Sequence, residues 1–241
     1  MSIENQLMIK LHARNVVVHE HLDALSEAVA QRVASLAVQR IATHGVFSLA
    51  VAGGETPRRC YSKLCQYDID WARVQIYFGD ERCLPQGDLQ RNDSMVRDAL
   101  ITRVGIPLAN VHSIPAELGP EQAAKIYSAL LHDVMPLDLV LLGMGEDGHT
   151  ASLFPNNSAL RNTDSVVPVW NAPKPPAERV SMGLNALNTA CQKIFLVAGA
   201  GKRAALEQIL HGDLLPAARV SDAEWHLDHA ALPEGVSASL V

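Results

Sequence analysis

Apolar residues near the start of the chain follow a helical spacing. They recur three or four positions apart, at Leu22, Leu25, Val29, Val33 and Leu36. This spacing places them on one face of a helix, so the sequence predicts a long helix that ends before Gly45.

Four short apolar runs further along the chain predict buried strands. They span residues 46–52, 74–78, 137–142 and 194–198, and a glycine follows each of them. A polar loop and a segment compatible with a helix come after each run. Continuous apolar strands that alternate with helices are typical of a parallel sheet covered on both faces. We therefore expect an α/β fold, with a Rossmann-like open, mainly parallel sheet and helices on both faces.

Length and composition favour a single α/β domain over residues 1–241. A hydrophobic content of 48% with 19% charged residues allows this chain to bury one large core. The net charge of −6 and the lack of a basic block argue against a nucleic-acid or membrane partner. The first residues lack a basic segment followed by an apolar run, so we expect a cytoplasmic protein. The cysteines lack the spacing of a zinc site, and we expect no metal.

A glycine-rich loop follows the first predicted strand. Gly53 and Gly54 permit unusual backbone angles and close approach of a ligand, while Thr56 and Pro57 suit a helix start as N-cap and first-turn residue. Free amide N–H groups at a positive helix end form a natural anion site. The alternative is a plain strand-to-helix turn. The loop is neither a Walker loop nor the Gly-x-Gly-x-x-Gly dinucleotide fingerprint.

Charged residues follow the second predicted strand. Asp80, Glu81 and Arg82 come directly after Gly79, at the same expected sheet edge as the glycine loop. A solvated turn with an internal ion pair would also explain them, but the neighbouring loop favours a functional role.

Two cations lie near the ends of later segments. Lys202 sits where a helix begins, and a lysine there opposes the helix macrodipole, which suggests a compensating anion. Arg179 follows a proline-rich loop and is a second candidate. A solvent-facing lysine and a surface salt bridge are the alternatives.

The strand at residues 137–142 runs into a polar, tightly turned corner with Asp147, Gly148 and His149. Catalytic groups of open α/β proteins gather at the carboxyl ends of strands. Histidine is the side chain best suited to acid/base work near neutral pH, so His149 is the candidate for that role. The alternative is a histidine satisfied within the turn. No Gly-x-Ser-x-Gly elbow or His-Glu-x-x-His helix is present, so hydrolysis would need water activated by a side chain.

Five segments, taken in order, resemble 6-phosphogluconolactonases, within the broader group that contains glucosamine-6-phosphate deaminases. They are GGETP at 53–57, FGDERCLP at 78–85, LLGMGEDGHTASLFP at 141–155, the proline segment before Arg179, and the glycine-flanked Lys202. The third segment is long and specific. The resemblance implies hydrolysis of a small phosphosugar lactone, 6-phosphoglucono-1,5-lactone, to 6-phosphogluconate in the pentose phosphate pathway, without metal, nucleotide or other cofactor.

The resemblance also implies roles for individual residues. His149 would be the general base, and Arg179 and Lys202 would hold the phosphate. Gly53 and Gly54 would lie against the substrate, and Arg82 and Asp147 would line the pocket. Asp147 would either orient the imidazole or cap the turn. The expected substrate-binding set is completed by Thr56, Asp80 and Gly148.

Glu55 departs from the family pattern, which commonly has a small polar or basic residue at this position. A carboxylate beside a bound phosphate would repel it. We therefore expect Glu55 to point outward or to bind Arg58 or Arg59.

Two other functions remain open. A glucosamine-6-phosphate deaminase would need a base near C1 and C2 of the sugar, which Asp80 or Glu81 could supply, but residues 150–155 differ from the deaminase continuation. A non-catalytic phosphosugar sensor would be expected to carry a DNA-binding segment, and the first 45 residues show no basic helix-turn-helix region. We favour the hydrolase, acting as a monomer or small homo-oligomer.

Overall fold

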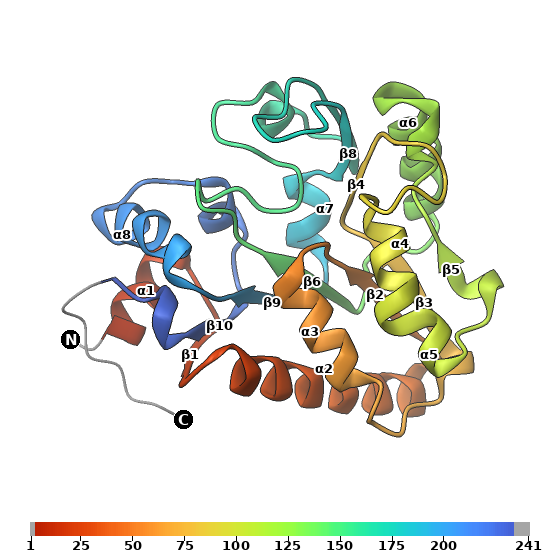
Figure 1. Cartoon of the computed structure of the whole chain (residues 1–241), viewed down its shortest axis with the longest axis horizontal. Helices are drawn as coiled ribbons and strands as arrows, with labels where there is room; N and C mark the ends of the chain where they lie inside the picture. Colours follow the sequence, from red (N-terminus) through yellow and green to blue (C-terminus); the bar gives the residue numbers. More distant parts are fainter. Residues whose placement is uncertain (1–2, 234–241) are drawn as a thin grey trace.

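A seven-stranded parallel sheet forms the centre of the computed structural model, which describes residues 3–233 (Figure 1). In spatial order its strands are β1 (Asn15–His19), β10 (Glu224–Asp228), β9 (Gln192–Val197), β6 (Leu139–Gly143), β2 (Phe47–Val51), β3 (Val74–Phe78) and β5 (Val111–His112). Every pairing in this sheet is parallel. The expected α/β fold is confirmed, and the carboxyl ends of the strands meet at one edge, where open α/β proteins bind ligands.

The helices include the long one that the apolar spacing predicts. They are α1 (Ile3–Leu11), α2 (Leu22–His44), α3 (Glu55–Leu64), α4 (Asn92–Val96), α5 (Thr102–Val104), α6 (Pro120–His132), α7 (Leu184–Thr189) and α8 (Arg203–His211), with a π-helical turn at Arg97–Ile101. Gly45 ends α2 because its φ of 81° is left-handed and its N–H binds the Ile41 carbonyl. None of the helices within residues 3–233 is long and apolar enough to cross a membrane.

A second, three-stranded antiparallel sheet has no counterpart in the sequence prediction. It orders β4 (Asp80–Arg82), β8 (Arg179–Met182) and β7 (Val166–Val169), and α6 packs against β7 and β8. Its register pairs Arg82 with Arg179. The polar run 80–82, expected to be a loop, is thus a strand, because pairing with a segment nearly 100 residues away overrides its weak local preference.

The main sheet also has strands that the sequence did not predict. β10 alternates the apolar residues Trp225 and Leu227 with polar ones, and all five of its residues are buried. Its polar side chains are satisfied by distant partners: Arg32 binds Glu224 at 2.6 Å, and Asp228 accepts the Gly199 N–H at 2.9 Å. Charged residues in this segment argued against a buried strand in the sequence, because the partners that satisfy them lie far away along the chain.

Two buried histidines join β1 and β10. His19 Nε2 lies 2.9 Å from His226 Nδ1, and both residues are at most 7% exposed. Burial lowers the pKa of both imidazoles, and burial together with the neighbouring His19 lowers the pKa of His226 to about 4. The pair is therefore stable in the folded protein only while it is uncharged.

This histidine pair predicts a loss of stability in mild acid. The unfolded chain binds a proton at His226 near its ordinary pKa of about 6.5, whereas the folded chain does so only near 4. The contribution is therefore present above pH 6.5 and is lost as the pH falls towards 4. Linkage gives a decrease of about 2 kcal/mol in the free energy of unfolding between pH 7 and pH 5.

Urea unfolding at pH 7 and pH 5 measures this decrease. The His226→Gln variant should show a smaller pH dependence than the wild type, while His211→Gln, at an exposed position, should match the wild type. Equal pH dependence in the His226 variant and the wild type would rule out His226 as the source.

Candidate active site

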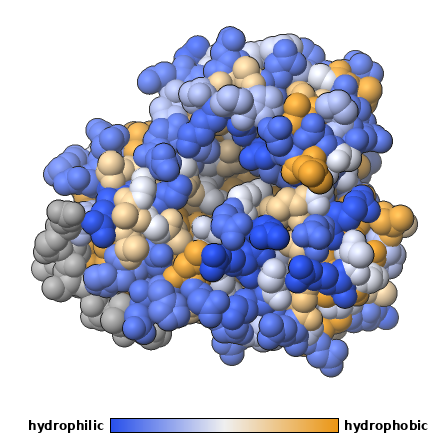
Figure 2. Space-filling model, viewed as in Figure 1, coloured by the Kyte–Doolittle hydropathy of each residue, from blue (hydrophilic) through white to orange (hydrophobic). Residues whose placement is uncertain are grey.

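A cavity of about 330 Å³ lies at the carboxyl edge of the main sheet, between the ends of β2, β3, β6 and β9. Figure 2 shows the surface hollowed between the part of the molecule that carries β8 and the part that carries α3. The predicted site residues that line the cavity are Gly53, Gly54, Asp80, Arg82, His149, Arg179 and Lys202. The structure thus brings together residues from five separate segments. Thr56, Asp147 and Gly148 are not part of the lining.

The turn after β6 presents His149 to this cavity. Gly145 donates its N–H to the His149 carbonyl at 2.8 Å, and Gly148 donates to the Gly145 carbonyl at 3.0 Å. A Cβ at Gly145 would lie 2.0 Å from His149 Nδ1, so only glycine leaves room for the imidazole. Gly148 has a φ of 75°, which explains its place in the turn without a substrate contact. This close packing of Gly145 against the imidazole explains why glycines flank the His149 turn in the sequence.

Asp147 holds the imidazole of His149 in one orientation. Its Oδ1 lies 2.5 Å from His149 Nδ1 and also accepts the His149 backbone N–H at 3.2 Å. It therefore performs both roles that the sequence left open, orienting the ring and capping the turn. Burial acts to raise the pKa of Asp147, but the hydrogen bonds from His149 outweigh it and lower the pKa to about 2. The ionised carboxylate accepts a hydrogen bond from the Nδ1–H group, which leaves the Nε2 lone pair as the basic site.

The glycine loop makes close contact with a residue that the sequence prediction missed. A Cβ at Gly53 would lie 1.9 Å from Asn92 Oδ1, so the absence of a side chain is required there. Asn92 also lines the cavity. Gly54 has a φ of 110° and is the N-cap of α3.

Two details of this loop concern the helix start. The prediction that Thr56 is the N-cap is wrong, because α3 already begins at Glu55 and Thr56 lies within its first turn. Glu55 points away from the cavity, as expected: its carboxylate lies 3.2 Å from Arg59 Nε and 3.6 Å from Arg58 Nη1. No carboxylate from this loop opposes an anion in the cavity.

Asp80 is the centre of a buried polar network beside the cavity. It is 7% exposed, and its carboxylate accepts hydrogen bonds from Ser152 Oγ at 2.5 Å and Asn92 Nδ2 at 3.1 Å. Asn92 Nδ2 also binds the Asp80 carbonyl at 2.8 Å. Both carboxylate oxygens are therefore engaged, which makes Asp80 a residue that positions its neighbours.

Most N–H groups of the Arg179 guanidinium bind backbone carbonyls of the proline-rich loop. Its Nε binds the Pro176 carbonyl at 3.1 Å, and its Nη2 binds the carbonyls of Lys174 and Pro175 at 3.0 and 3.2 Å. Only Nη1, 3.5 Å from Ser152 Oγ, remains for a ligand. Arg179 thus fixes the shape of the loop that carries Lys174, a role that the sequence did not predict.

Arg82 lies opposite Arg179 in the second sheet and keeps an unused donor. Its Nη1 binds the Gln90 carbonyl at 2.5 Å, while its buried Nε has no hydrogen-bond partner among the described residues. A buried N–H without a partner is costly. The Arg82 residue also lines the cavity, so its guanidinium group adds positive charge there.

Two lysines complete the positive side of the cavity. Burial lowers the pKa of Lys202, and Lys174 adds to this effect, while Glu146 opposes it. Lys174 Nζ lies 4.0 Å from a Glu146 carboxylate oxygen. A partly buried lysine and an exposed one, with one exposed acid nearby, favour the binding of an anion.

The sequence offered little sign of Asn92 or Lys174. Asn92 stands in a polar run without periodicity, and its role depends on Asp80 and Gly53, which are distant in sequence. Lys174 lies in the proline-rich segment, whose composition indicated a loop near the site but no particular residue. Within residues 3–233, no cluster of three or more His, Cys, Asp or Glu residues is placed to hold a metal ion.

Known proteins resemble this chain in sequence and fold. A family model described as glucosamine-6-phosphate isomerases/6-phosphogluconolactonase matches residues 20–228. A 6-phosphogluconolactonase of Synechocystis is 38% identical over 70% of this chain and 73% of its own, and one of Mycobacterium leprae is 35% identical over 85% and 91%. The crystal structure of 6-phosphogluconolactonase from Thermotoga maritima matches with a TM-score of 0.82 at 28% identity, covering 89% of this chain and all of that one.

Proposed function

Because this chain belongs to the family of glucosamine-6-phosphate isomerases and 6-phosphogluconolactonases, we infer that it hydrolyses 6-phosphoglucono-1,5-lactone to 6-phosphogluconate in the pentose phosphate pathway. The observation that carries the mechanism is the His149–Asp147 pair, set in a cavity lined by four cationic side chains. The cytoplasmic location and the monomeric or small homo-oligomeric state stay predictions.

In the proposed mechanism His149 activates water. Its Nε2 takes a proton from a water molecule that attacks the C1 carbonyl, and the imidazolium then returns the proton to the departing ring oxygen. Asp147, ionised because its pKa is about 2, stabilises the imidazolium through Nδ1. The guanidinium group of Arg82, which lines the cavity, is the donor we assign to the developing oxyanion.

We assign the binding of the phosphate group to the cationic side chains that line the cavity with His149. Lys202 and Lys174 supply flexible ammonium donors, and Arg179 supplies Nη1. Charge-assisted hydrogen bonds of this kind hold the lactone carbonyl near His149, so binding energy contributes to positioning.

The carboxylates that a deaminase would use as a base are unavailable here. Asp80 is bound by Ser152 and Asn92. Glu81 is fully buried and accepts backbone N–H groups from Arg82, Asn92 and Asp93. Neither is free to move a proton between C1 and C2, which supports the hydrolase.

Two substrates test this function. With freshly generated 6-phosphogluconolactone, we expect 6-phosphogluconate to form faster than in a buffer blank, read through a coupled dehydrogenase. With glucosamine 6-phosphate, we expect no ammonia release. The opposite pattern, ammonia release without lactone acceleration, would overturn the proposal.

The Asp147→Asn variant tests the orienting role. Asparagine can cap the turn, but it cannot stabilise the imidazolium, so kcat should fall roughly 10- to 100-fold while KM changes little. Glu146→Gln, which removes a neighbouring exposed charge, is the control and should retain most of the wild-type kcat. Unchanged kcat in Asp147→Asn would reduce the role of Asp147 to capping.

A further inference from the structure

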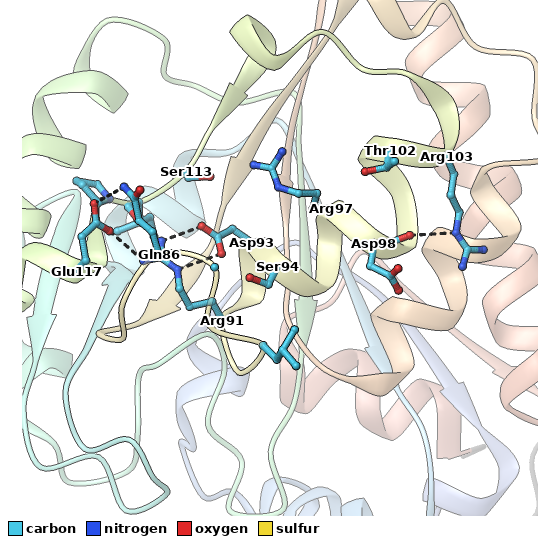
Figure 3. Close-up of a pocket in the computed structure, with 14 residues that line it drawn as sticks. Gln86, Arg91, Asp93, Ser94, Arg97, Asp98, Thr102, Arg103, Ser113 and Glu117 are labelled. Atoms are coloured by element: carbon cyan, nitrogen blue, oxygen red, sulfur yellow. Dashed lines mark hydrogen bonds and ion pairs between the residues drawn. The ribbon is translucent and has the colours of Figure 1, made fainter.

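A second and larger cavity lies on the other side of the segment that carries Asn92. Its volume is about 830 Å³, against about 330 Å³ for the catalytic cavity. It is bounded by α4, the π-helical turn Arg97–Ile101, α5 and residues 113–117 (Figure 3). This volume is within the range of small-molecule sites.

Three polar side chains on this cavity wall have unused donors. Figure 3 shows Arg97 pointing from the helix towards Ser113, with Ser94 on the same side of the helix. Among residues 3–233, none of these three side chains makes a hydrogen bond or ion pair with another described residue. A guanidinium and two hydroxyl groups are thus available to a ligand.

The acidic groups around the cavity are bound to other cations. Asp93 and Glu117 bind the guanidinium of Arg91 at 2.8 and 2.9 Å, and Arg91 is only 1% exposed. Asp98 lies 3.8 Å from Arg58 Nη2. Arg97 is therefore a cation on this wall that the nearby carboxylates leave without a partner.

We propose that this cavity is a second ligand site, for a phosphate monoester, with Arg97 as its anchor. A phosphate presents three acceptor oxygens in a tetrahedral arrangement, which suits donors arriving from one guanidinium and two separate hydroxyls. A carboxylate accepts hydrogen bonds mainly near one plane, so it matches donors from separate elements less well than a tetrahedral phosphate does. The π-helical turn that begins at Arg97 adds to the argument, because such turns recur at functional sites.

The segment 91–93 contributes side chains to both the new site and the catalytic cavity. Arg91 and Asp93 line the larger cavity, while Asn92 between them lines the catalytic one. The carboxylate of Glu81 holds the backbone N–H groups of both Asn92 and Asp93, at 2.7 and 2.8 Å. A ligand that moves the start of α4 therefore moves Asn92 with it.

Calorimetric titration with 6-phosphogluconate tests the proposal through binding alone. The wild type should show two sites. Arg97→Gln should weaken one of them at least tenfold and keep kcat unchanged without added ligand, because Arg97 does not touch the catalytic cavity. Lys202→Ala should weaken the other site and retain the one that depends on Arg97. Arg161→Gln, which replaces an exposed arginine elsewhere, should behave as the wild type.

Two outcomes overturn the proposal. One is a single site in the wild type that Arg97→Gln leaves unchanged, and the other is a pair of sites that this variant leaves unchanged. A titration with malate separates phosphate esters from carboxylates: we expect no Arg97-dependent binding of this dicarboxylate, and such binding would refute the assignment to phosphate. Because the readout is binding, the result does not depend on whether the catalytic cavity hydrolyses the lactone.

Discussion

Replacing His149 with glutamine is expected to lower kcat by roughly 10²- to 10⁴-fold, the usual contribution of a general base. Glutamine fills a similar volume and can accept a hydrogen bond, but it cannot carry the proton taken from water. The anchoring cations are untouched, so the affinity for 6-phosphogluconate should stay close to that of the wild type. Loss of kcat with retained product binding is the signature of a group that acts on the reacting atoms.

Steady-state kinetics with a coupled dehydrogenase measures this effect, after subtraction of spontaneous hydrolysis. His132→Gln is the matched control, because that imidazole is 87% exposed and lies outside the cavity. It should leave kcat and KM unchanged. A His149 variant with near-normal kcat would remove His149 from the mechanism.

Replacing Lys202 with alanine is expected to raise KM at least tenfold, with a smaller change in kcat. The lysine is half-buried, and burial lowers its pKa because it partly desolvates the charged ammonium group. A charge-assisted hydrogen bond to phosphate contributes about 1.5–3 kcal/mol, which corresponds to roughly a 10- to 100-fold change in affinity.

The unphosphorylated substrate glucono-1,5-lactone makes this test specific. If Lys202 binds the phosphate, the variant and the wild type should hydrolyse this compound at similar rates. Lys125→Ala, an exposed lysine on α6, is the control with the phosphorylated lactone. An equal loss on both substrates would indicate that Lys202 acts on the ring or the reaction centre.

The main sheet could be predicted because its central strands carry their own signal. The runs that become β2, β3, β6 and β9 are mainly apolar, as is typical of strands covered on both faces. The glycine after each run marked the loops that form the site. His149 could be singled out as a candidate for the same reason, since its turn follows a strand that the sequence defines clearly.

The second sheet, and the contacts that depend on it, could not be predicted from apolar runs in the sequence. Arg82 and Arg179 become neighbours only through the pairing of β4 with β8, and β4 is entirely polar. The hydrogen bonds of Arg179 to the loop carbonyls follow from that loop's folded shape. Asn92 gains its role from contacts with Asp80 and Gly53. Such partners are set by tertiary structure, which local patterns do not record.

The most direct test of the central claim is the initial rate of hydrolysis of freshly generated 6-phosphogluconolactone, compared among the wild type, His149→Gln and a blank without protein. The account predicts a rate proportional to wild-type concentration and a His149→Gln rate close to the blank. A wild-type rate equal to the blank would contradict the proposed function, and a fully active His149→Gln variant would contradict the proposed base.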